Sequence, residues 1–285
     1  MKLIDIHSHV QFAAYDTDRD EVMARAREAG IGMINVGTQQ DTSKAAVELA
    51  HKYPEIAYAT IGLHPIHTSK SHHDEQELGL ADQKFTSRGE EFDYDFYKKL
   101  GADPKVVAIG ECGLDYYRLT SETQNAQRVA FEKQIELAVE LQKPLMLHIR
   151  NARGISGEGA YDDVLAMLDA TRYTARATRS PGDVHFFAGD WPTAKKFLDL
   201  GFALSFTGVI TFTHDYDEVV KNTPLDMILS ETDSPYITPV PLRGKRNEPI
   251  NVKYVVAKIA ELKKLPLEHV QSALLQNAKR VFKMI

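Results

Sequence analysis

The feature of this sequence that most limits its fold is a regular alternation of short apolar runs with longer amphipathic stretches. The runs are continuously apolar, which is typical of strands buried on both faces of a parallel sheet. Eight runs predict strands at Leu3–Ile6, Ile31–Val36, Ile56–Leu63, Val106–Ile109, Pro144–Leu147, Val184–Phe187, Phe202–Phe206 and Asp226–Leu229. Strands of this kind need helices on the faces of the sheet.

Helices are expected between these runs, at residues 18–29, 41–53, 122–141, 160–170, 191–200 and 214–222, and in a tail over about 250–283. Eight strand–helix repeats favour an α/β fold of the TIM-type (β/α)8 barrel over a doubly wound sheet. The 285 residues suit a single barrel domain, 1–285, with an extra C-terminal helix.

Residues 66–95 interrupt this rhythm after the third predicted strand. The segment contains three Lys or Arg and eight Asp or Glu residues, a net charge of −5. We interpret it as an acidic insertion above the barrel, which is either a lid or mobile loop over the site or a solvated decoration.

Composition and charge narrow the possible functions. No apolar run approaches the roughly 20 residues that cross a bilayer, so no membrane association is expected. Asp5 and His7 lie where a signal peptide would continue as an apolar run, and Cys112 is the only cysteine. Both features fit a cytoplasmic protein. The net charge of −6 argues against a broad basic face, so a polyanionic substrate would be held locally.

Histidines and carboxylates follow several predicted strands. His7 and His9 close the first strand two positions apart, so both can face one ion. Glu111 follows the fourth strand, where a buried carboxylate needs a partner. His148 and His185 end the fifth and sixth strands, and Asp233 lies just past the eighth. Taken singly, each could be a hydrogen-bonded or core residue.

The coincidence of these six residues favours a shared metal site. In a barrel the C-terminal ends of the strands converge on the face that carries active sites. Glu111 lies between the two groups of ligands and could bridge ions about 3.5–4 Å apart. His64 ends the third strand on the same rim, where we assign it to substrate contact or proton transfer. Further cationic residues on this rim are candidates for binding substrate phosphates: Arg150, Arg243, Lys245 and Arg246.

Several motifs resemble the TatD family of metal-dependent deoxyribonucleases and hydrolases across nearly the whole chain. The matching segments are Asp5–His9, Gly62–Pro65, Gly110–Tyr116, Leu147–Ala152, His185–Gly189, Glu231–Pro235, Pro241–Gly244, Asn247–Pro249 and Asn277–Phe282. The resemblance implies one metal on His7, His9, Glu111 and Asp233, and a second on Glu111, His148 and His185. The chain departs from the family at Phe186 and Ala188, where the usual motif has Cys and Ser, and in the length of the 66–95 insertion.

The expected reaction is hydrolysis of DNA or a short oligonucleotide by hydroxide that two divalent ions activate. Mixed imidazole and carboxylate ligands suit Zn, Mn, Co or Fe, with Mg also possible. Asp233 is the expected proton acceptor, and His64 is expected to position the phosphate or protonate the leaving group. The protein is expected to be a monomer or a weak oligomer.

Two alternatives remain open at this point. The first is a binuclear enzyme related to amidohydrolases that acts on an ester, lactone or amide. Many such enzymes have a carbamylated lysine as the bridge, whereas Glu111 occupies that place here. The second is a non-enzymatic metal-dependent nucleic-acid-binding protein, against which a full set of ligands argues. The sequence shows neither a Gly-x-Ser-x-Gly elbow nor a Gly-rich phosphate loop, which disfavours a serine hydrolase or a nucleotide-driven enzyme.

Overall fold

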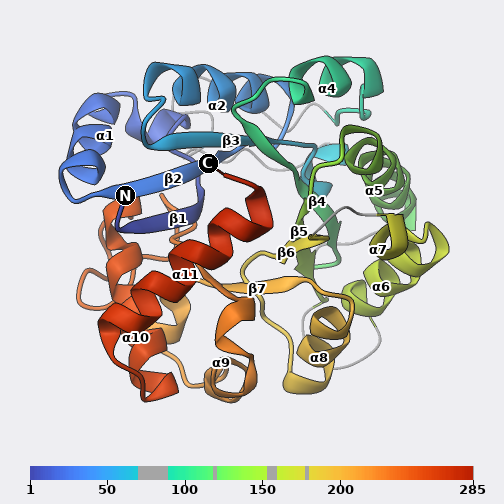
Figure 1. Ribbon diagram of the computed structural model, residues 1–285. Helices are drawn as coiled ribbons and strands as arrows, with labels where there is room; N and C mark the ends of the chain where they lie inside the picture. Colours follow the sequence, from blue (N-terminus) through green and yellow to red (C-terminus); the bar gives the residue numbers. More distant parts are fainter. Residues whose placement is uncertain (70–88, 118–120, 153–158, 177–179, 285) are drawn as a thin grey trace.

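Eight parallel strands form one sheet in which each strand pairs with the next along the chain (Figure 1). The computed structural model describes residues 1–69, 89–117, 121–152, 159–176 and 180–284. The strands are β1 Leu3–Ser8, β2 Ile31–Val36, β3 Ala57–Ile61, β4 Val106–Asp115, β5 Leu145–Arg150, β6 Gly182–Val184, β7 Ala203–Phe206 and β8 Ile228–Ser230. The predicted barrel is therefore confirmed.

The sheet closes where the end of β1 meets the loop after β8. The Asp233 N–H donates to the His7 carbonyl at 2.9 Å, and the His9 N–H donates to the Ser234 carbonyl at 2.8 Å. Beneath them, the Asp5 carboxylate accepts hydrogen bonds from the N–H and the hydroxyl of Thr232. These contacts make the barrel nearly continuous and bring three predicted ligands together.

Several strands extend beyond the ends of their apolar runs, β1 as far as Ser8 and, by more residues, β4 and β5. β4 continues to Asp115 and β5 to Arg150, because the backbones stay paired through Gly113 with His148 and Asp115 with Arg150. Glu111 and His148 consequently lie within strands rather than after them, which corrects the sequence-based expectation. β6 begins and ends earlier than predicted, at Gly182–Val184 instead of Val184–Phe187, so that His185 follows it directly.

Helices surround the barrel; most of them connect successive strands, and the last two follow the final strand (Figure 1). They are α1 Arg19–Glu28, α2 Gln40–Lys52, α4 Tyr94–Gly101, α5 Ser121–Leu141, α6 Ala160–Ala170, α7 Tyr173–Arg176, α8 Trp191–Asp199, α9 Asp217–Asn222, α10 Val252–Lys263 and α11 Leu267–Phe282. Short 3-10 helices are η1 Ala13–Tyr15, η2 Pro65–Thr68, η3 Gly208–Thr211, η4 Leu225–Met227 and η5 Pro249–Asn251.

Two helical features differ from expectation. The predicted tail over 250–283 is two helices, because Lys264 adopts a left-handed conformation at the end of α10 and Pro266 precedes α11. The end of the predicted 66–95 insertion leads into α4, which the sequence analysis did not predict. Most of that insertion, residues 70–88, lies outside the described residues.

The apolar core has two layers. The larger lies between the strands and the surrounding helices, and the smaller fills the barrel interior around Ile6 and Val36. Val281 and Phe282 of α11 belong to the inner layer. Asn277 on the same helix donates hydrogen bonds to the Leu225 and Ile228 carbonyls at the start of β8. α11 therefore covers the N-terminal end of the barrel (Figure 1). The predicted ligands lie at the opposite end, where the strands have their C-terminal ends.

Candidate metal centre

A pocket of about 190 Å³ opens among the C-terminal ends of the strands. Five of the six predicted ligands line it, and the sixth, His7, lies directly beneath. The histidine and carboxylate side chains are buried or nearly so, with His148 and Asp233 partly exposed. The barrel thus brings together all six residues that the sequence analysis singled out.

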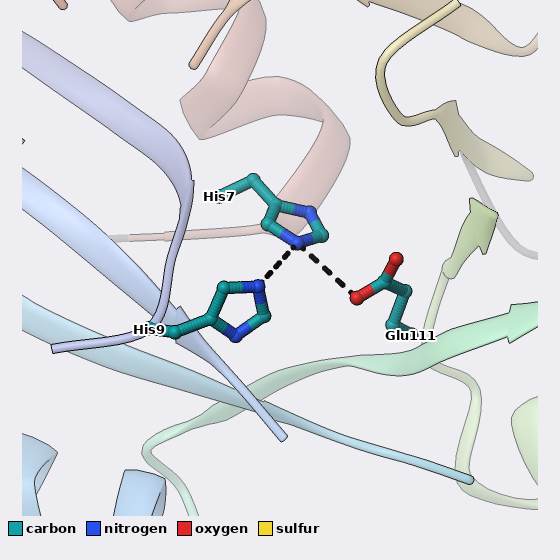
Figure 2. A group of neighbouring side chains, drawn as sticks. All are labelled: His7, His9 and Glu111. Carbon is teal, nitrogen blue, oxygen red and sulfur yellow. Dashed lines mark hydrogen bonds and ion pairs between the residues drawn. The ribbon is translucent and has the colours of Figure 1, made fainter. Parts of the chain in front are cut away.

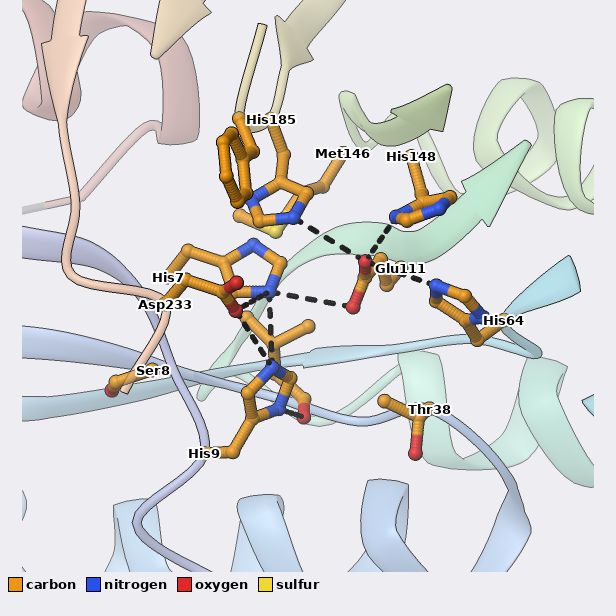
Figure 3. A network of polar contacts seen from close by, with 12 residues as sticks. His7, Ser8, His9, Thr38, His64, Glu111, Met146, His148, His185 and Asp233 are labelled. Atoms are coloured by element: carbon orange, nitrogen blue, oxygen red, sulfur yellow. Dashed lines mark hydrogen bonds and ion pairs between the residues drawn. The ribbon is translucent and has the colours of Figure 1, made fainter. Parts of the chain in front are cut away.

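Glu111 lies at the centre of this group, and its two oxygens face different sides. Oε2 is 3.3 Å from Nε2 of His7, which is in turn 3.2 Å from Nε2 of His9 (Figure 2). Oε1 is 2.8 Å from Nδ1 of His148 and 3.4 Å from Nε2 of His185 (Figure 3). One carboxylate therefore separates two clusters of ligand atoms, as a bridging ligand must.

Asp233 completes the first cluster. Its Oδ1 is 3.6 Å from Nε2 of His9 and 3.8 Å from Nε2 of His7. The backbone of Asp233 is left-handed, with φ of 53°, which allows its N–H to reach the His7 carbonyl while the side chain turns into the site. Short polar residues tolerate this conformation better than others.

Each of three histidines has its outer ring nitrogen near a fixed acceptor. Nδ1 of His9 lies 2.9 Å from the Val36 carbonyl, Nε2 of His148 lies 3.0 Å from Asp115, and Nδ1 of His185 lies 3.0 Å from Glu231. Such partners set the tautomer and orientation of a metal-binding imidazole. In the neutral ring, the nitrogen that faces the pocket keeps its lone pair for an ion.

His64 is arranged in the opposite way. Its Nδ1 accepts a hydrogen bond from the Ile66 N–H at 3.1 Å, so the proton of the neutral ring is on Nε2. Nε2 lies 3.2 Å from Oε1 of Glu111. Burial and the nearby His148 lower the pKa of His64 to about 4, so the ring is neutral at pH 7. In this tautomer Nε2 of His64 presents a hydrogen-bond donor to the site; by distance alone, His64 could also hold an ion together with Glu111 and His148.

The site holds several charges away from water. Burial opposes ionisation of Glu111, but the surrounding histidines more than offset it and hold its pKa well below the usual range. Burial likewise opposes protonation of His148 and His185, yet neighbouring carboxylates raise their pKa values to about 9 and about 10. Within the described residues, the ion-pair partners of Glu111 and Asp233 are all histidines: His7, His9, His64, His148 and His185. Such a donor set, without lysine or arginine, fits divalent cations.

The four predicted phosphate-binding cations lie in different surroundings. Arg150 lines the pocket, and its guanidinium lies 3.9 Å over the ring of Tyr117. Arg243 lies 4.0 Å over Phe212 on the rim, and Lys245 is exposed. Arg246 is not brought to the pocket wall. Its guanidinium donates to both carboxylate oxygens of Asp18, at 2.8 and 2.6 Å.

Sequence reasoning missed two residues that hold the ligands in place, Asp115 and Glu231. Asp115 contacts His148, and burial of Asp115 is outweighed by that contact, so that its pKa falls to about 2. Glu231 is fully buried and accepts hydrogen bonds from the Phe186 N–H and the Ser205 hydroxyl. Their closeness in sequence to predicted ligands could have indicated this role, because each is a carboxylate within four positions of one.

Among the described residues, no helix has the length and apolar character needed to cross a membrane.

The chain is similar to known proteins over nearly its whole length. The profile of the family described as TatD related DNase matches residues 4–283. A metal-dependent hydrolase of Bacillus subtilis, YabD, is 37% identical over 99% of both chains. The 3'-5' ssDNA/RNA exonuclease TatD of Yersinia pseudotuberculosis is 33% identical over 99% of this chain and 100% of that protein. The crystal structure of YjjV, a TatD homolog of Escherichia coli, superposes with a TM-score of 0.80 and 26% identity, covering 100% of this chain and 99% of that one.

Proposed function

We propose that this metal-dependent hydrolase, which belongs to the family of TatD related DNases, cleaves the phosphodiester bonds of DNA. The observation that carries the proposal is the placement of Glu111 between two clusters of ligand atoms. A centre with two cations attracts phosphodiesters without a basic protein surface, which fits a net charge of −6.

The proposed ligands form two sets that share Glu111. His7, His9, Glu111 and Asp233 would hold one divalent ion, and Glu111, His148 and His185 would hold the second. Imidazole together with carboxylate favours zinc, manganese, cobalt or iron over magnesium. When bound, such ions lower the pKa of water and withdraw charge from a phosphate oxygen.

Two side chains of the protein are assigned the proton acceptor and the hydrogen-bond donor of the reaction. Oδ1 of Asp233 faces His7 and His9, so we assign Oδ2 to accept the proton of the attacking water. Burial works against the charge of Asp233, but the adjacent histidines lower its pKa and keep it ionised, as an acceptor must be. Nε2–H of His64 would donate a hydrogen bond to a phosphate oxygen. Arg150, which lines the same pocket, would hold a neighbouring phosphate.

The experiment is a substrate panel with the purified protein: single-stranded and duplex DNA, single-stranded RNA, and p-nitrophenyl acetate. Each substrate is tested with and without EDTA, and then with Zn²⁺, Mn²⁺, Co²⁺, Fe²⁺ or Mg²⁺ restored. We expect DNA cleavage that EDTA abolishes and added metal restores. Metal-dependent hydrolysis of the ester without cleavage of DNA would instead support the amidohydrolase-like alternative. Binding of DNA without turnover of any substrate would support the non-enzymatic one.

A further inference from the structure

A second cavity, of about 410 Å³, adjoins the metal pocket. The two share five lining residues: His148, Arg150, His185, Asp233 and Tyr236. The second cavity adds a wall that the metal pocket lacks, made of Ile149, Phe186, Ala188, Tyr216 and Ile237. A molecule that binds the metals can therefore extend directly into it, and its volume suits a small organic group.

The added wall is largely apolar and aromatic. Phe186 directly follows the proposed ligand His185, and the centroids of the two rings are 6.0 Å apart at an angle of 83°. Tyr216 and Tyr236 contribute further aromatic surface from the loops after β7 and β8. A flat, weakly polar group would be bound here by stacking on the aromatic rings and by the burial of its apolar surface away from water.

The backbone of this wall is held in a costly conformation. Seven non-glycine residues among those described have positive φ, and four of them end or follow the helices α5, α6, α10 and α11, where this conformation is common. The other three all line the second cavity: Phe186 at 44°, Asp233 at 53° and Ile237 at 48°. For a β-branched or bulky residue this backbone is unfavourable, and such residues gather at functional sites.

A buried carboxylate also holds the backbone of Phe186. Its N–H donates a hydrogen bond of 2.8 Å to Glu231, the same carboxylate that lies 3.0 Å from the ring of His185. One buried group thus positions both a proposed metal ligand and the aromatic residue beside it. Glu231 therefore fixes the position of Phe186 relative to His185.

We propose that the second cavity binds the unstacked nucleobase of the nucleotide whose phosphate occupies the metal centre, with Phe186 as a stacking surface. This inference rests on the proposed function and adds to it a binding site for the base of the substrate. A base in a duplex is paired and stacked between neighbours, so it cannot enter a cavity beside its own phosphate. Arg150, which lines both cavities, lies where it can hold the phosphate of the neighbouring nucleotide.

The test compares a nucleotide with the corresponding sugar phosphate that lacks the base. Isothermal titration of Zn²⁺-loaded protein with deoxyadenosine 5′-monophosphate and with 2-deoxyribose 5-phosphate measures what the base contributes, because the phosphate is common to both. We expect the nucleotide to bind about 5- to 160-fold more tightly, the range that one stacked base provides. Phe186→Ala should lose most of this ratio, and Phe186→Tyr should keep it.

Phe96→Ala is the matched control, since Phe96 is another partly buried phenylalanine and lies on α4, outside both cavities. It should leave the ratio unchanged, and thermal melts establish that every variant is folded. Equal binding of the two ligands to the wild type, or no binding of either, overturns the base site; so does an unchanged ratio in Phe186→Ala. Cleavage of oligonucleotides is measured on the same preparations. If cleavage persists while the base contributes nothing, only the base site fails; if no phosphodiester is cleaved, the proposed function fails as well.

Discussion

Oε1 of Glu231 lies 3.0 Å from Nδ1 of His185, on the side of the ring that faces away from Glu111. Glu231 has no exposed surface, and its charge is the main factor that offsets burial and raises the pKa of His185. The pair has the arrangement of a carboxylate that orients a metal-binding histidine. Glu231 is thus placed to orient His185, a proposed ligand of the second metal.

Glu231→Gln removes this charge while keeping the size of the side chain. We expect the affinity for the second metal to fall about 10- to 100-fold, the usual effect of losing such a partner, and phosphodiesterase activity at limiting metal to fall with it. A chelator competition titration measures the affinity. Glu261→Gln, at an exposed position on α10, is the control. A folded Glu231→Gln protein with wild-type metal affinity would exclude the orienting role.

Metal binding should depend steeply on pH. Without metal, the pKa values of His148 and His185 are raised to about 9 and about 10, so both rings are protonated at pH 7 and must lose a proton to bind an ion. The apparent metal affinity should therefore rise from pH 7 to about 10 and then level off. Titration calorimetry at pH 7 in buffers of different protonation enthalpy should detect up to about two protons released. Affinity that is independent of pH, with no proton release, would contradict this assignment.

The same raised pKa values give the metal-free protein a stability that depends on pH. Groups whose pKa rises on folding stabilise the protein fully below their unfolded pKa of about 6.5, and this contribution disappears as the pH passes the folded pKa. The metal-free protein should thus lose stability between about pH 6.5 and 10. Saturating metal should weaken this trend, because the bound rings are neutral at every pH in this range. Urea unfolding across the range measures both curves.

Arg150 and Arg246 should differ in what their removal changes. Arg150→Ala should raise the KM for single-stranded DNA and lower the slope of log affinity against log salt by about 0.7, with little change in stability. Arg246→Ala should leave the KM nearly unchanged and reduce the free energy of unfolding by about 1–2 kcal/mol, because Arg246 pairs with Asp18 and stacks on Tyr15. Steady-state kinetics at several salt concentrations and urea unfolding test both variants. An increase in KM for Arg246→Ala as large as that for Arg150→Ala would return Arg246 to the substrate site.

These two arginines also show what the sequence could and could not predict. Both follow a strand on the same rim, so the pattern assigns them one role. The partner that engages Arg246 is 228 positions away, and no local pattern indicates it. The six candidate ligands were predictable because each is polar and lies within a continuous apolar run or no more than four positions after one.

The lengths of the central strands were less predictable for a related reason. Gly110 and Gly113 interrupt the apolar run of β4, and glycine is depleted in strands, so the prediction ended at Ile109. The strand continues because β5 supplies hydrogen-bond partners as far as Asp115. Pairing with a neighbouring strand, rather than local propensity, places Glu111 inside the barrel wall and facing both clusters of ligands.

The central claim is that Glu111 joins two metal ions, and the most direct test is the metal content of ligand variants by mass spectrometry after desalting. His185→Ala removes a ligand of the second ion only and should retain about one ion per chain. Asp233→Asn keeps a neutral oxygen for the first ion and should lose the least metal. Glu111→Ala removes a ligand from both ions, so it should retain the least metal of the three and show almost no phosphodiesterase activity. Circular dichroism melts should show that all three remain folded, since the ligands lie at the rim of the apolar core. If Glu111→Ala keeps two ions per chain and substantial activity, Glu111 is not the bridge and the two-metal account is wrong.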